Sequence, residues 1–265
     1  MTENSLLQVI KIGGNIIDDP EALDDFLEKF SALRGKKILV HGGGKEATRV
    51  AVKMGVQTKM IDGRRITDKE MLDIVTMVYA GKINKEIVVR LQKMHTEALG
   101  LTGADVNTIQ TVKRPVKDID YGYVGDVLHD SVNVLNIKKI LDAGFIPVFS
   151  AITHNGNGKL LNTNADTVAA ALASAFSSTY DVSLVYSFEK NGVLSDINDE
   201  DSIIEQIDKE QYEAFKNEGV VNQGMIPKLD NAFEALMKGV SRVYIGNARN
   251  LQLLQQDAFG TKLII

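Results

Sequence analysis

The sequence predicts an α/β protein with a mainly parallel sheet, because strand-like and helix-like segments alternate along the chain. Short apolar runs at residues 9–12 and 37–41 are typical of buried strands, and glycines follow each of them. Apolar residues then recur at helical spacing over residues 20–33 and 46–54. Parallel strands need long connections, so this order of elements indicates strands joined by crossover helices.

The rest of the chain contains a β-rich middle between further helices. Residues 68–94 form a long helical stretch, which is either one bent helix or two. The Asn-Gly-Asn-Gly turn at residues 155–158 separates two apolar arms and predicts a hairpin over residues 152–161. The other expected strands are at 108–112, 121–128, 146–149, 151–153, 182–186 and 243–245. The other expected helices are at 167–177, 204–218 and 225–238.

Composition restricts the class of function. The chain has 265 residues, of which 44% are hydrophobic and 25% charged, as is typical of a soluble globular protein with a substantial core. A net charge of -5 argues against a nucleic-acid binder, because a surface that follows phosphates carries a basic excess. The absence of cysteine excludes disulfides, thiolate metal sites and a cysteine nucleophile. No apolar run reaches the roughly 18 residues of a membrane span, so we expect a cytoplasmic protein.

A lysine and two glycines follow the first expected strand, in the order Lys11-Ile12-Gly13-Gly14. Such a turn can cradle phosphate oxygens with its backbone N–H groups, because glycine permits a close approach that a Cβ atom would block. An ordinary turn after a lysine at the end of a strand is the alternative. This motif alone does not decide between the two.

A second glycine turn, His41-Gly42-Gly43-Gly44, lies between a strand and a helix. The spacing fits a dinucleotide fingerprint only in part, and an esterase oxyanion loop would need a Gly-x-Ser-x-Gly nucleophile that the chain lacks. A cradle for a carboxylate or a phosphate at the helix N-terminus is the interpretation that remains. His41 itself is expected to be a packed residue at the end of the strand.

Polar residues also gather at the start of two later helices. The segment Asn162-Thr163-Asn164-Ala165-Asp166 holds more side chains than one helix cap needs, and Asp166 could hold cationic groups around a charged ligand. Lys228 lies near the first turn of another helix, where the dipole disfavours a cation, which favours an anionic partner; a solvated lysine is the alternative.

Two neighbouring arginines, Arg64 and Arg65, follow a turn, and arginine suits bidentate recognition of a carboxylate. One of the two is expected to be an ordinary surface charge. The chain has neither a Walker A sequence nor a His-Arg-Asp catalytic loop. Any phosphate chemistry must therefore use a different scaffold.

In this order, the motifs IKIGGN, VHGGG, GRRIT, LLNTNAD, GMIPK and FGTKLII resemble the acetylglutamate kinases of the amino acid kinase superfamily. The resemblance covers nearly the whole chain. It implies a three-layer αβα sandwich around one mainly parallel sheet. It further implies an N-terminal lobe, 1–165, for acyl-amino-acid binding and dimerisation, and a C-terminal lobe, 166–265, for ATP binding.

The implied activity is transfer of a phosphoryl group from ATP, carried with Mg²⁺, to the γ-carboxylate of N-acetyl-L-glutamate in arginine biosynthesis. Lys11 matches the lysine that stabilises the transferring group, Lys228 the lysine on the nucleotide side, and Asp166 the acid that orients both. The implied substrate-binding residues are Gly43, Gly44, Arg65 and Asn162. The implied nucleotide-binding residues are Gly13, Gly14, Ser187, Gly192, Asn222 and Gly224. No metal ligand from the protein is implied.

This assignment agrees with the chemistry of phosphoryl transfer between two anions. The acceptor carboxylate is already ionised at neutral pH, so no general base is needed. Charge neutralisation and positioning remain as the tasks of the protein, and lysines and glycines suit them. The acyl phosphate product is reactive, so closure of the two lobes should exclude water.

The chain departs from the family pattern at two places. The nucleotide loop at residues 187–192 is one residue longer, which puts its individual contacts in doubt. Lys45 stands where many relatives have proline, and could attract the extra carboxylate of an N-succinyl group; a solvent-facing lysine is the alternative. Few residues precede the first strand, so we expect a homodimer without strong arginine feedback.

Other functions stay open at this point. The chain could phosphorylate N-succinyl-L-glutamate, or it could be a sister kinase for aspartate, glutamate, carbamate or a nucleoside monophosphate. It could also be a sensor that binds a nucleotide or metabolite without catalysis. Retention of Lys11, Asp166 and Lys228 together argues against a sensor, because a sensor does not need both lysines.

Overall fold

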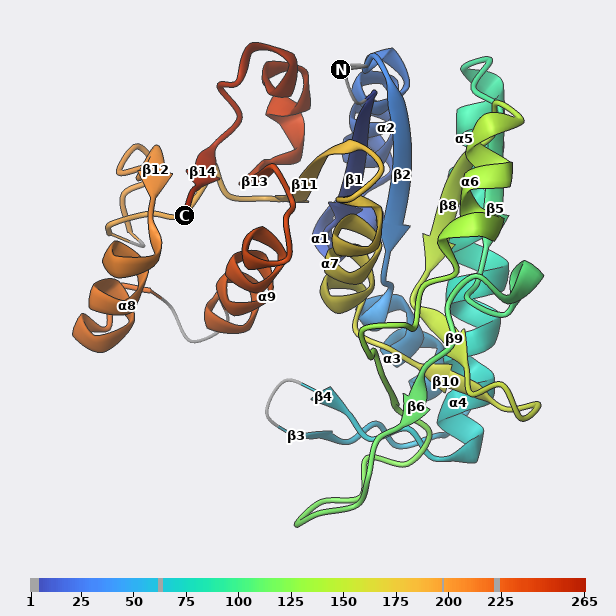
Figure 1. The fold of residues 1–265 in the computed structure, drawn as a ribbon. Helices are drawn as coiled ribbons and strands as arrows, with labels where there is room; N and C mark the ends of the chain where they lie inside the picture. Colours follow the sequence, from blue (N-terminus) through green and yellow to red (C-terminus); the bar gives the residue numbers. More distant parts are fainter. Residues whose placement is uncertain (1–4, 62–63, 197, 222–224) are drawn as a thin grey trace. The chain divides into compact units, whose positions relative to one another are not determined.

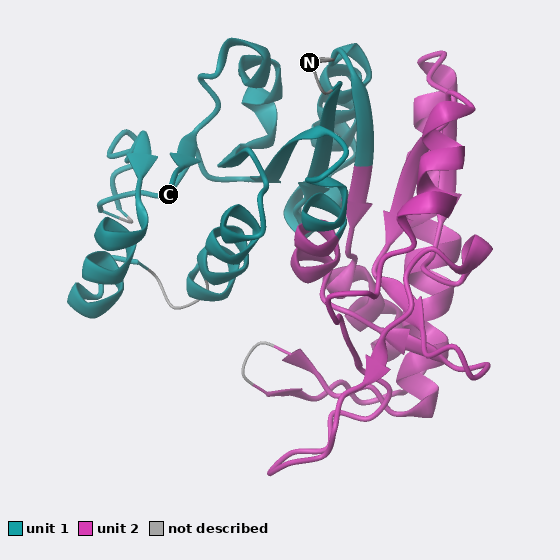
Figure 2. Cartoon of the chain, viewed as in Figure 1, with its two compact units in different colours: residues 1–38, 172–265 teal, residues 39–171 magenta. Residues whose placement is uncertain are grey.

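The computed structural model describes residues 5–61, 64–196, 198–221 and 225–265. The chain forms two compact units: unit 1 comprises Met1–Ile38 and Leu172–Ile265, and unit 2 comprises Leu39–Ala171 (Figure 2). The backbone passes from one unit to the other within strand β2 and again within helix α7. Residues 1–38, which the sequence prediction grouped with the N-terminal lobe, thus share a unit with residues 172–265.

Unit 1 contains a mostly parallel set of strands in the spatial order β12–β14–β13–β11–β1 (Figure 1). Strand β1 runs parallel to β11, and β11 runs parallel to β13, while β14 is antiparallel to β13. The central strands are buried along nearly their whole length, as is typical of parallel strands covered on both faces. The bounds are β1 Leu6–Ile12, β11 Asp181–Phe188, β12 Gln206–Ile207, β13 Arg242–Asn247 and β14 Thr261–Leu263.

The helices of unit 1 follow clear local signals. Asp19 caps α2 by accepting hydrogen bonds from Glu21 and Ala22, and Pro20 occupies the first helical position. Helix α2 buries Leu23 and three further apolar side chains at helical spacing. The bounds are α1 Gly14–Ile17, α2 Pro20–Ala32, α8 Lys209–Glu218, α9 Ile226–Met237 and the 3₁₀ helix η3 Ala248–Gln256.

Among its described residues, unit 2 contains three parallel strands and three short antiparallel pairs. Strand β8 pairs in parallel with β5 and with residues Leu39, Val40 and His41 of β2. The parallel strands are β2 Lys36–His41, β5 Ala98–Leu101 and β8 Ile146–Ser150. The antiparallel pairs are β3 Met60–Ile61 with β4 Arg64–Arg65, β6 Val112–Lys113 with β7 Gly125–Asp126, and β9 Ile152–His154 with β10 Leu160–Asn162.

One long helical stretch dominates unit 2. It consists of α4 Lys69–Thr76, a π-helical turn η1 Met77–Ile83 and α5 Asn84–Lys93, without a break between them. Asp68 caps its start by accepting a hydrogen bond from the amide of Met71. The remaining helices are α3 Gly44–Lys53, the 3₁₀ turn η2 Asp105–Asn107, α6 Val134–Asp142 and α7 Ala165–Phe176.

The predicted α/β fold with a mainly parallel sheet is confirmed, as are the hairpin at 152–161 and the long helical stretch at 68–94. Three predicted elements differ from the structure. The strand predicted at 121–128 is reduced to the two residues of β7, Gly125–Asp126. Residues 108–111 form no strand, and strand β6 begins only at Val112. Residues 204–208 are not helical, because Gln206 and Ile207 pair with β14 and a capping box at Asp208 starts α8 one residue later.

The elements that position the candidate sites are therefore the strand ends and the glycine turns beside them.

Within the described ranges, no helix combines the length and the apolar character that crossing a membrane would require.

Candidate active site

Unit 2 contains a pocket of about 250 Å³ at the ends of its strands and helices. Its walls come from the glycine turn after β2, the β3–β4 hairpin, the π-helical turn, the β6–β7 region and the segment before α7. All four residues predicted to bind the acyl-glutamate line it, namely Gly43, Gly44, Arg65 and Asn162. The structure thus brings together residues as far apart in the sequence as Gly43 and Asn162.

The glycine turn has a conformation that other residues could not adopt. Gly43 has a φ of 151°, and a Cβ atom there would lie 2.3 Å from Cδ1 of Ile83 and 3.0 Å from Cδ1 of Tyr79. Helix α3 starts directly after it at Gly44. The first amide groups of a helix have no partner within the helix and favour an anion, so the turn is suited to a carboxylate.

His41 supports this turn from the interior. The ring is fully buried, with Nδ1 2.8 Å from the carbonyl oxygen of Gly42 and Nε2 3.0 Å from Nδ2 of Asn84. Burial lowers the pKa of His41 to about 4, so the ring is neutral at physiological pH. Nδ1–H then donates to Gly42, and Nε2 accepts from Asn84. The prediction of a packed residue at the strand end is confirmed.

Arg65 connects the β3–β4 hairpin to helix α3. Its Nη2 donates to the carbonyl oxygen of Gly44 and to Oγ1 of Thr48, both at 2.8 Å. The side chain is buried, whereas its neighbour Arg64 is exposed although it also lines the pocket. The expectation that one of the two arginines is a surface charge is confirmed.

The polar residues of the segment before α7 have different positions and contacts. Asn162 donates to Oγ1 of Thr67 at 3.0 Å and lines the pocket. Asn164 caps α7 by accepting a hydrogen bond from the amide of Thr167 at 3.0 Å. Asp166 lies in the first turn of α7, between the lining residues Ala165 and Thr167. One residue of the segment is therefore a helix cap, and Asn162 faces the pocket.

The pocket also contains residues that the sequence did not single out. Arg114 donates from Nε to both carboxylate oxygens of Asp126, at 3.0 and 3.2 Å. Tyr79, from the π-helical turn, forms part of the wall beside Arg65. Neither residue carries a sequence signal, because Tyr79 has the spacing of a core residue on a helix and Arg114 lies in a loop before a proline.

Unit 1 has a pocket of its own, of about 280 Å³, beside the end of β11. Two predicted residues line it, the nucleotide-binding Gly192 and the catalytic Lys228. Its character is mixed, with apolar side chains beside charged ones. The remaining lining residues are Phe188, Glu189, Lys190, Val193, Leu194, Val220, Val221 and Met225.

Aromatic rings lie next to the lysine of this pocket. The Lys228 ammonium is 5.0 Å from the ring centroid of Tyr186 and 6.0 Å from that of Phe188. Both rings belong to β11, and such cation–π contacts hold a lysine without neutralising its charge. The position of Lys228 therefore follows from β11, the strand that precedes the nucleotide loop.

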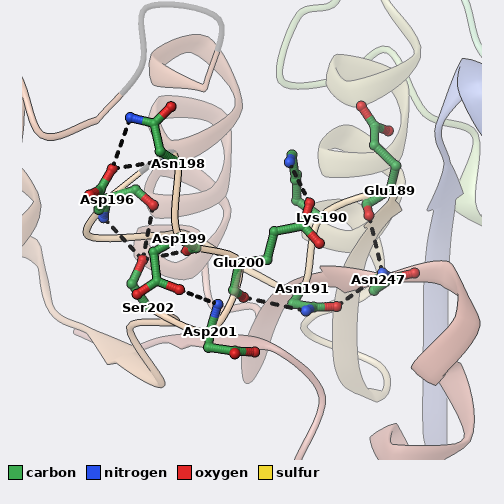
Figure 3. Close-up of polar contacts among 10 residues, drawn as sticks. All are labelled: Glu189, Lys190, Asn191, Asp196, Asn198, Asp199, Glu200, Asp201, Ser202 and Asn247. Atoms are coloured by element: carbon green, nitrogen blue, oxygen red, sulfur yellow. Dashed lines mark hydrogen bonds and ion pairs between the residues drawn. The ribbon is translucent and has the colours of Figure 1, made fainter.

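The loop after β11 is fixed by polar contacts, which Figure 3 shows. Asn247 donates from Nδ2 to the carbonyl oxygen of Glu189 at 3.1 Å and to Oδ1 of Asn191 at 3.0 Å. Lys190 forms an ion pair with Glu200 at 2.8 Å. These contacts hold the loop that follows β11 in its observed conformation.

The C-terminal motif completes this loop. Thr261 is fully buried, and its Oγ1 accepts a hydrogen bond from the amide of Val193 at 2.8 Å. A Cβ atom on Gly192 would lie 2.6 Å from the same Oγ1. The glycine is therefore needed for a close approach between the loop and the C-terminal segment.

The first glycine motif lies at the end of β1, also in unit 1. The amide of Gly13 donates to the carbonyl oxygen of Ser187 at 2.8 Å, and a Cβ atom on Gly13 would lie 3.2 Å from Cβ of Phe188. Lys11 is paired in register with Tyr186. The buried Ser187 hydroxyl has no hydrogen-bond partner among the described residues, and Gly14 begins the short helix α1.

The other predicted nucleotide-binding residues, Asn222 and Gly224, lie outside the described residues. Lys45 is exposed, and it is not part of the described lining of the unit 2 pocket. In the part of the chain that the structure describes, no group of three or more His, Asp or Glu side chains is arranged to hold a metal ion.

A model of the amino acid kinase family matches residues 7–247 of this chain. Among curated proteins, the chain is 53% identical over 261 residues to an acetylglutamate kinase of Cytophaga hutchinsonii, which covers 97% of this chain and 98% of that protein. It is 51% identical over 257 residues to an acetylglutamate kinase of Bacteroides thetaiotaomicron, with coverages of 97% and 98%.

Solved structures show the same fold. The protein smu.665 of Streptococcus mutans superposes with a TM-score of 0.79 at 26% identity, over 97% of this chain and 98% of that one. Carbamate kinase of Giardia lamblia, solved with AMP-PNP, superposes with a TM-score of 0.71 at 13% identity, over 100% of this chain and 99% of that one.

Proposed function

This chain belongs to the amino acid kinase family, and we propose that it phosphorylates the γ-carboxylate of N-acetyl-L-glutamate with ATP, giving N-acetyl-L-glutamyl 5-phosphate in arginine biosynthesis. One observation carries this proposal. The pocket of unit 2 joins a buried arginine, an asparagine and a glycine turn at a helix N-terminus, which together suit a small dicarboxylate.

The acyl-glutamate occupies this pocket of about 250 Å³. Arg65 and Asn162 hold one carboxylate, since a guanidinium matches its planar geometry. The amide groups of Gly43 and Gly44 receive the other, at the positive end of α3. The acetyl group contacts the remaining lining, which includes Met60 and Val124.

ATP binds to unit 1. The apolar residues Val193, Val221 and Met225 suit the base, and the Lys228 ammonium suits the phosphates. Mg²⁺ arrives with ATP and neutralises phosphate charge, held mainly by the phosphates themselves as is usual for this ion. The site therefore does not require a cage of protein carboxylates.

The reaction forms a bond between a γ-carboxylate oxygen and the γ-phosphorus and breaks the bond from that phosphorus to the bridging oxygen of ADP. The carboxylate attacks as an anion, so no proton is moved. Lys11 neutralises charge on the transferring group, Lys228 does so on the nucleotide side, and Asp166 orients the two lysines. These roles suit phosphoryl transfer, where positioning and electrostatic stabilisation dominate.

We further propose a cytoplasmic homodimer without strong arginine feedback. Apolar side chains are exposed around the edge strand β5 of unit 2, and they would be covered in a dimer. They are Val89, Leu99, Leu135 and Phe145. Light scattering with and without arginine tests this proposal: a monomer, or a change of mass on adding arginine, contradicts it.

The activity is tested by trapping the acyl phosphate as a hydroxamate, with N-acetyl- and N-succinyl-L-glutamate in parallel. We expect ATP-dependent product with a preference for the acetyl substrate. A preference for the succinyl substrate would keep the mechanism and change the acyl group. No product with either would contradict the proposal, and ATP binding without turnover would then favour a sensor.

A further inference from the structure

One guanidinium of the unit 2 pocket has a buried nitrogen without a hydrogen-bond partner among the described residues. Arg114 donates from Nε to both carboxylate oxygens of Asp126, at 3.0 and 3.2 Å, and from Nη2 to Oδ1 of the same carboxylate. Its Nη1 is the buried nitrogen that lacks a partner, and Arg114 lines the pocket. Buried donors are nearly always paired, so an unpaired donor on a pocket-lining residue indicates a ligand that accepts from it.

The guanidinium is held in one orientation. Asp126 grips it along one edge, and the ring of Tyr121 lies with its centroid 5.2 Å from Cζ of Arg114. The backbone of this segment is fixed as well. The amide of Arg114 donates to the carbonyl oxygen of Val124 at 2.8 Å, and the amide of Thr67 donates to that of Tyr121 at 3.0 Å. A planar group fixed in this way presents its remaining donors in a defined direction.

The charge of Arg114 is already compensated by Asp126. Asp126 is the one acidic side chain in the described lining of the pocket, and it forms an ion pair with Arg114. Arg65, Asn162 and the glycine turn supply the donors for the two carboxylates in the proposed function. The free donor of a neutralised pair therefore suits a neutral acceptor. An N-acylated glutamate has one, the carbonyl oxygen of its acyl group.

The position of Arg114 in the pocket agrees with this acceptor. Val124, which accepts the backbone hydrogen bond of Arg114, is one of the residues that would contact the acetyl group. The next contact leads to the carboxylate side of the pocket, because the amide of Asn162 donates to the carbonyl oxygen of Tyr123 at 2.9 Å. Arg114 thus belongs to the part of the wall that faces the acyl group, beside the part that holds a carboxylate.

We propose that Arg114 determines specificity for the acyl group. Its Nη1 donates a hydrogen bond to the acyl carbonyl oxygen, while Asp126 orients the guanidinium and neutralises its charge. This inference rests on the proposed function of the pocket. Free glutamate lacks the acyl oxygen and would leave a buried donor unpaired, and a site built around such a hydrogen bond rejects analogues that cannot form it.

The first test is steady-state kinetics of Arg114→Lys by the hydroxamate assay. Lysine keeps the charge beside Asp126 but lacks the planar fork that presents a further donor. We expect the KM for N-acetyl-L-glutamate to rise about tenfold, because one hydrogen bond from a charged group is lost. The KM for N-succinyl-L-glutamate should rise equally, since both substrates share this carbonyl group. The kcat and the KM for ATP should stay within about twofold of wild type.

The matched control is Arg242→Lys. Arg242 also pairs with an aspartate, Asp181, at 2.7 Å, and it lies outside the described linings of both pockets. Its kinetic constants should match those of wild type. A tenfold rise in the KM for N-acetyl-L-glutamate in this control as well would show a general response to the loss of an arginine, and would overturn the inference.

The second test removes the compensating charge. Asp126→Asn keeps the shape of the side chain and leaves the Arg114 cation uncompensated beside the acyl group. The ratio of kcat/KM for N-succinyl- to N-acetyl-L-glutamate should therefore rise about threefold or more, because only the succinyl group brings a further carboxylate to this cation. Asp181→Asn is the control, and it should leave the ratio unchanged.

The remaining outcomes each contradict the inference in a different way. An unchanged KM for N-acetyl-L-glutamate in Arg114→Lys would overturn it. A loss confined to the succinyl substrate would assign Arg114 to the terminal carboxylate instead. Equal changes for both substrates in Asp126→Asn would place Arg114 at a carboxylate that both share. A fall in kcat together with a rise in both KM values in Arg114→Lys would indicate a structural defect and overturn it too.

These results are distinguishable from failure of the proposed function. If wild type turns over N-acetyl-L-glutamate and Arg114→Lys behaves identically, only the role of Arg114 is wrong. If wild type makes no product, calorimetric titration with N-acetyl-L-glutamate decides whether the pocket binds it, and the same titration of Arg114→Lys then tests the inference. A wild-type chain that neither reacts with nor binds this compound overturns both.

Discussion

The two pockets of the molecule are built in different ways. In unit 2, polar side chains from separate elements define the pocket, and hydrogen bonds hold the buried Arg65 and the half-buried Asn162. In unit 1, apolar residues form much of the lining, and Lys228 is seated against aromatic rings. A small anionic substrate needs exact placement of charges, whereas a nucleotide base needs mainly apolar surface. The difference therefore follows from the chemistry of the two proposed ligands.

The largest effect is expected from Lys11, because its proposed role belongs to the transition state and not to either pocket. We predict that Lys11→Ala lowers kcat by about 10²-fold or more, as when one preorganised charge-stabilising donor is lost. Both KM values should change far less. Initial-rate kinetics with each substrate varied in turn measure the three quantities.

The control is Lys29→Ala, which removes a lysine of α2 that forms an ion pair with Asp25. Pairs of this kind contribute little, so its kinetics should match wild type. Near-normal turnover of Lys11→Ala would reject the assignment of Lys11 as a catalytic residue.

The next largest effect is a loss of folding stability at acidic pH, and we expect it to arise from the residue that supports the unit 2 pocket. His41 supports the unit 2 turn, and burial lowers its pKa from 6.5 to about 4 in the folded state. Between pH 6.5 and pH 4 the unfolded chain binds this proton more tightly than the folded chain does. The contribution of neutral His41 to the free energy of unfolding is therefore fully present above about pH 6.5 and is lost as the pH falls toward 4. The full shift is worth about 3 kcal/mol. The corresponding support in unit 1, Thr261, does not titrate in this range.

Urea denaturation at pH 7 and pH 5 measures this loss. The variant His41→Gln should show a smaller difference between the two pH values than wild type. His129→Gln removes an exposed histidine and should keep the wild-type difference. Equal pH dependence in wild type and His41→Gln would contradict the prediction.

A smaller effect is expected from the apolar surface of the unit 1 pocket. Val193→Thr keeps the shape of the side chain and places a hydroxyl in the pocket, so the KM for ATP should rise several-fold, roughly the cost of partly desolvating one hydroxyl. The KM for the acyl-glutamate should not change. Initial rates at varied ATP concentration measure the effect.

Val240→Thr is the matched control, because Val240 is buried to the same degree in unit 1 and lies outside the pocket lining. It should lose stability without a change in the KM for ATP. An equal rise in both variants would show that unit 1 responds to any polar substitution and that the pocket is not selective.

The same contrast explains how much the sequence could predict. Glycine turns, helix caps and strand-end charges leave local patterns, so all four predicted acyl-glutamate residues lie together in one pocket. Tyr79 was missed because a buried tyrosine at helical spacing looks like a core residue, although it also lines the pocket. In the unit 1 pocket, Gly192 and Lys228 were predicted, but the apolar lining residues were missed because ordinary apolar residues carry no local signal.

Errors in the fold have a similar origin. The predicted start of helix α8 was too early, because the apolar residues near 204 continue the helical spacing. The Asp208 capping box marks the observed start. The strands β12 and β14 are only two and three residues long, and each is defined by its hydrogen bonds to a neighbouring strand. Helix α6 and strand β5 were not predicted either. Pairing partners distant in sequence leave no local signal.

The smallest effect is expected at Lys45, and it tests whether the unit 2 pocket extends beyond its lining. Lys45 is exposed in the first turn of α3, where the helix dipole disfavours a cation. We predict that Lys45→Ala leaves the ratio of kcat/KM for N-acetyl- and N-succinyl-L-glutamate within about twofold and stabilises the fold by a few tenths of a kcal/mol. Lys53→Ala, at the last turn of the same helix, should instead destabilise it slightly. A selective loss of the succinyl substrate in Lys45→Ala alone would extend the pocket to this lysine and assign it the extra carboxylate.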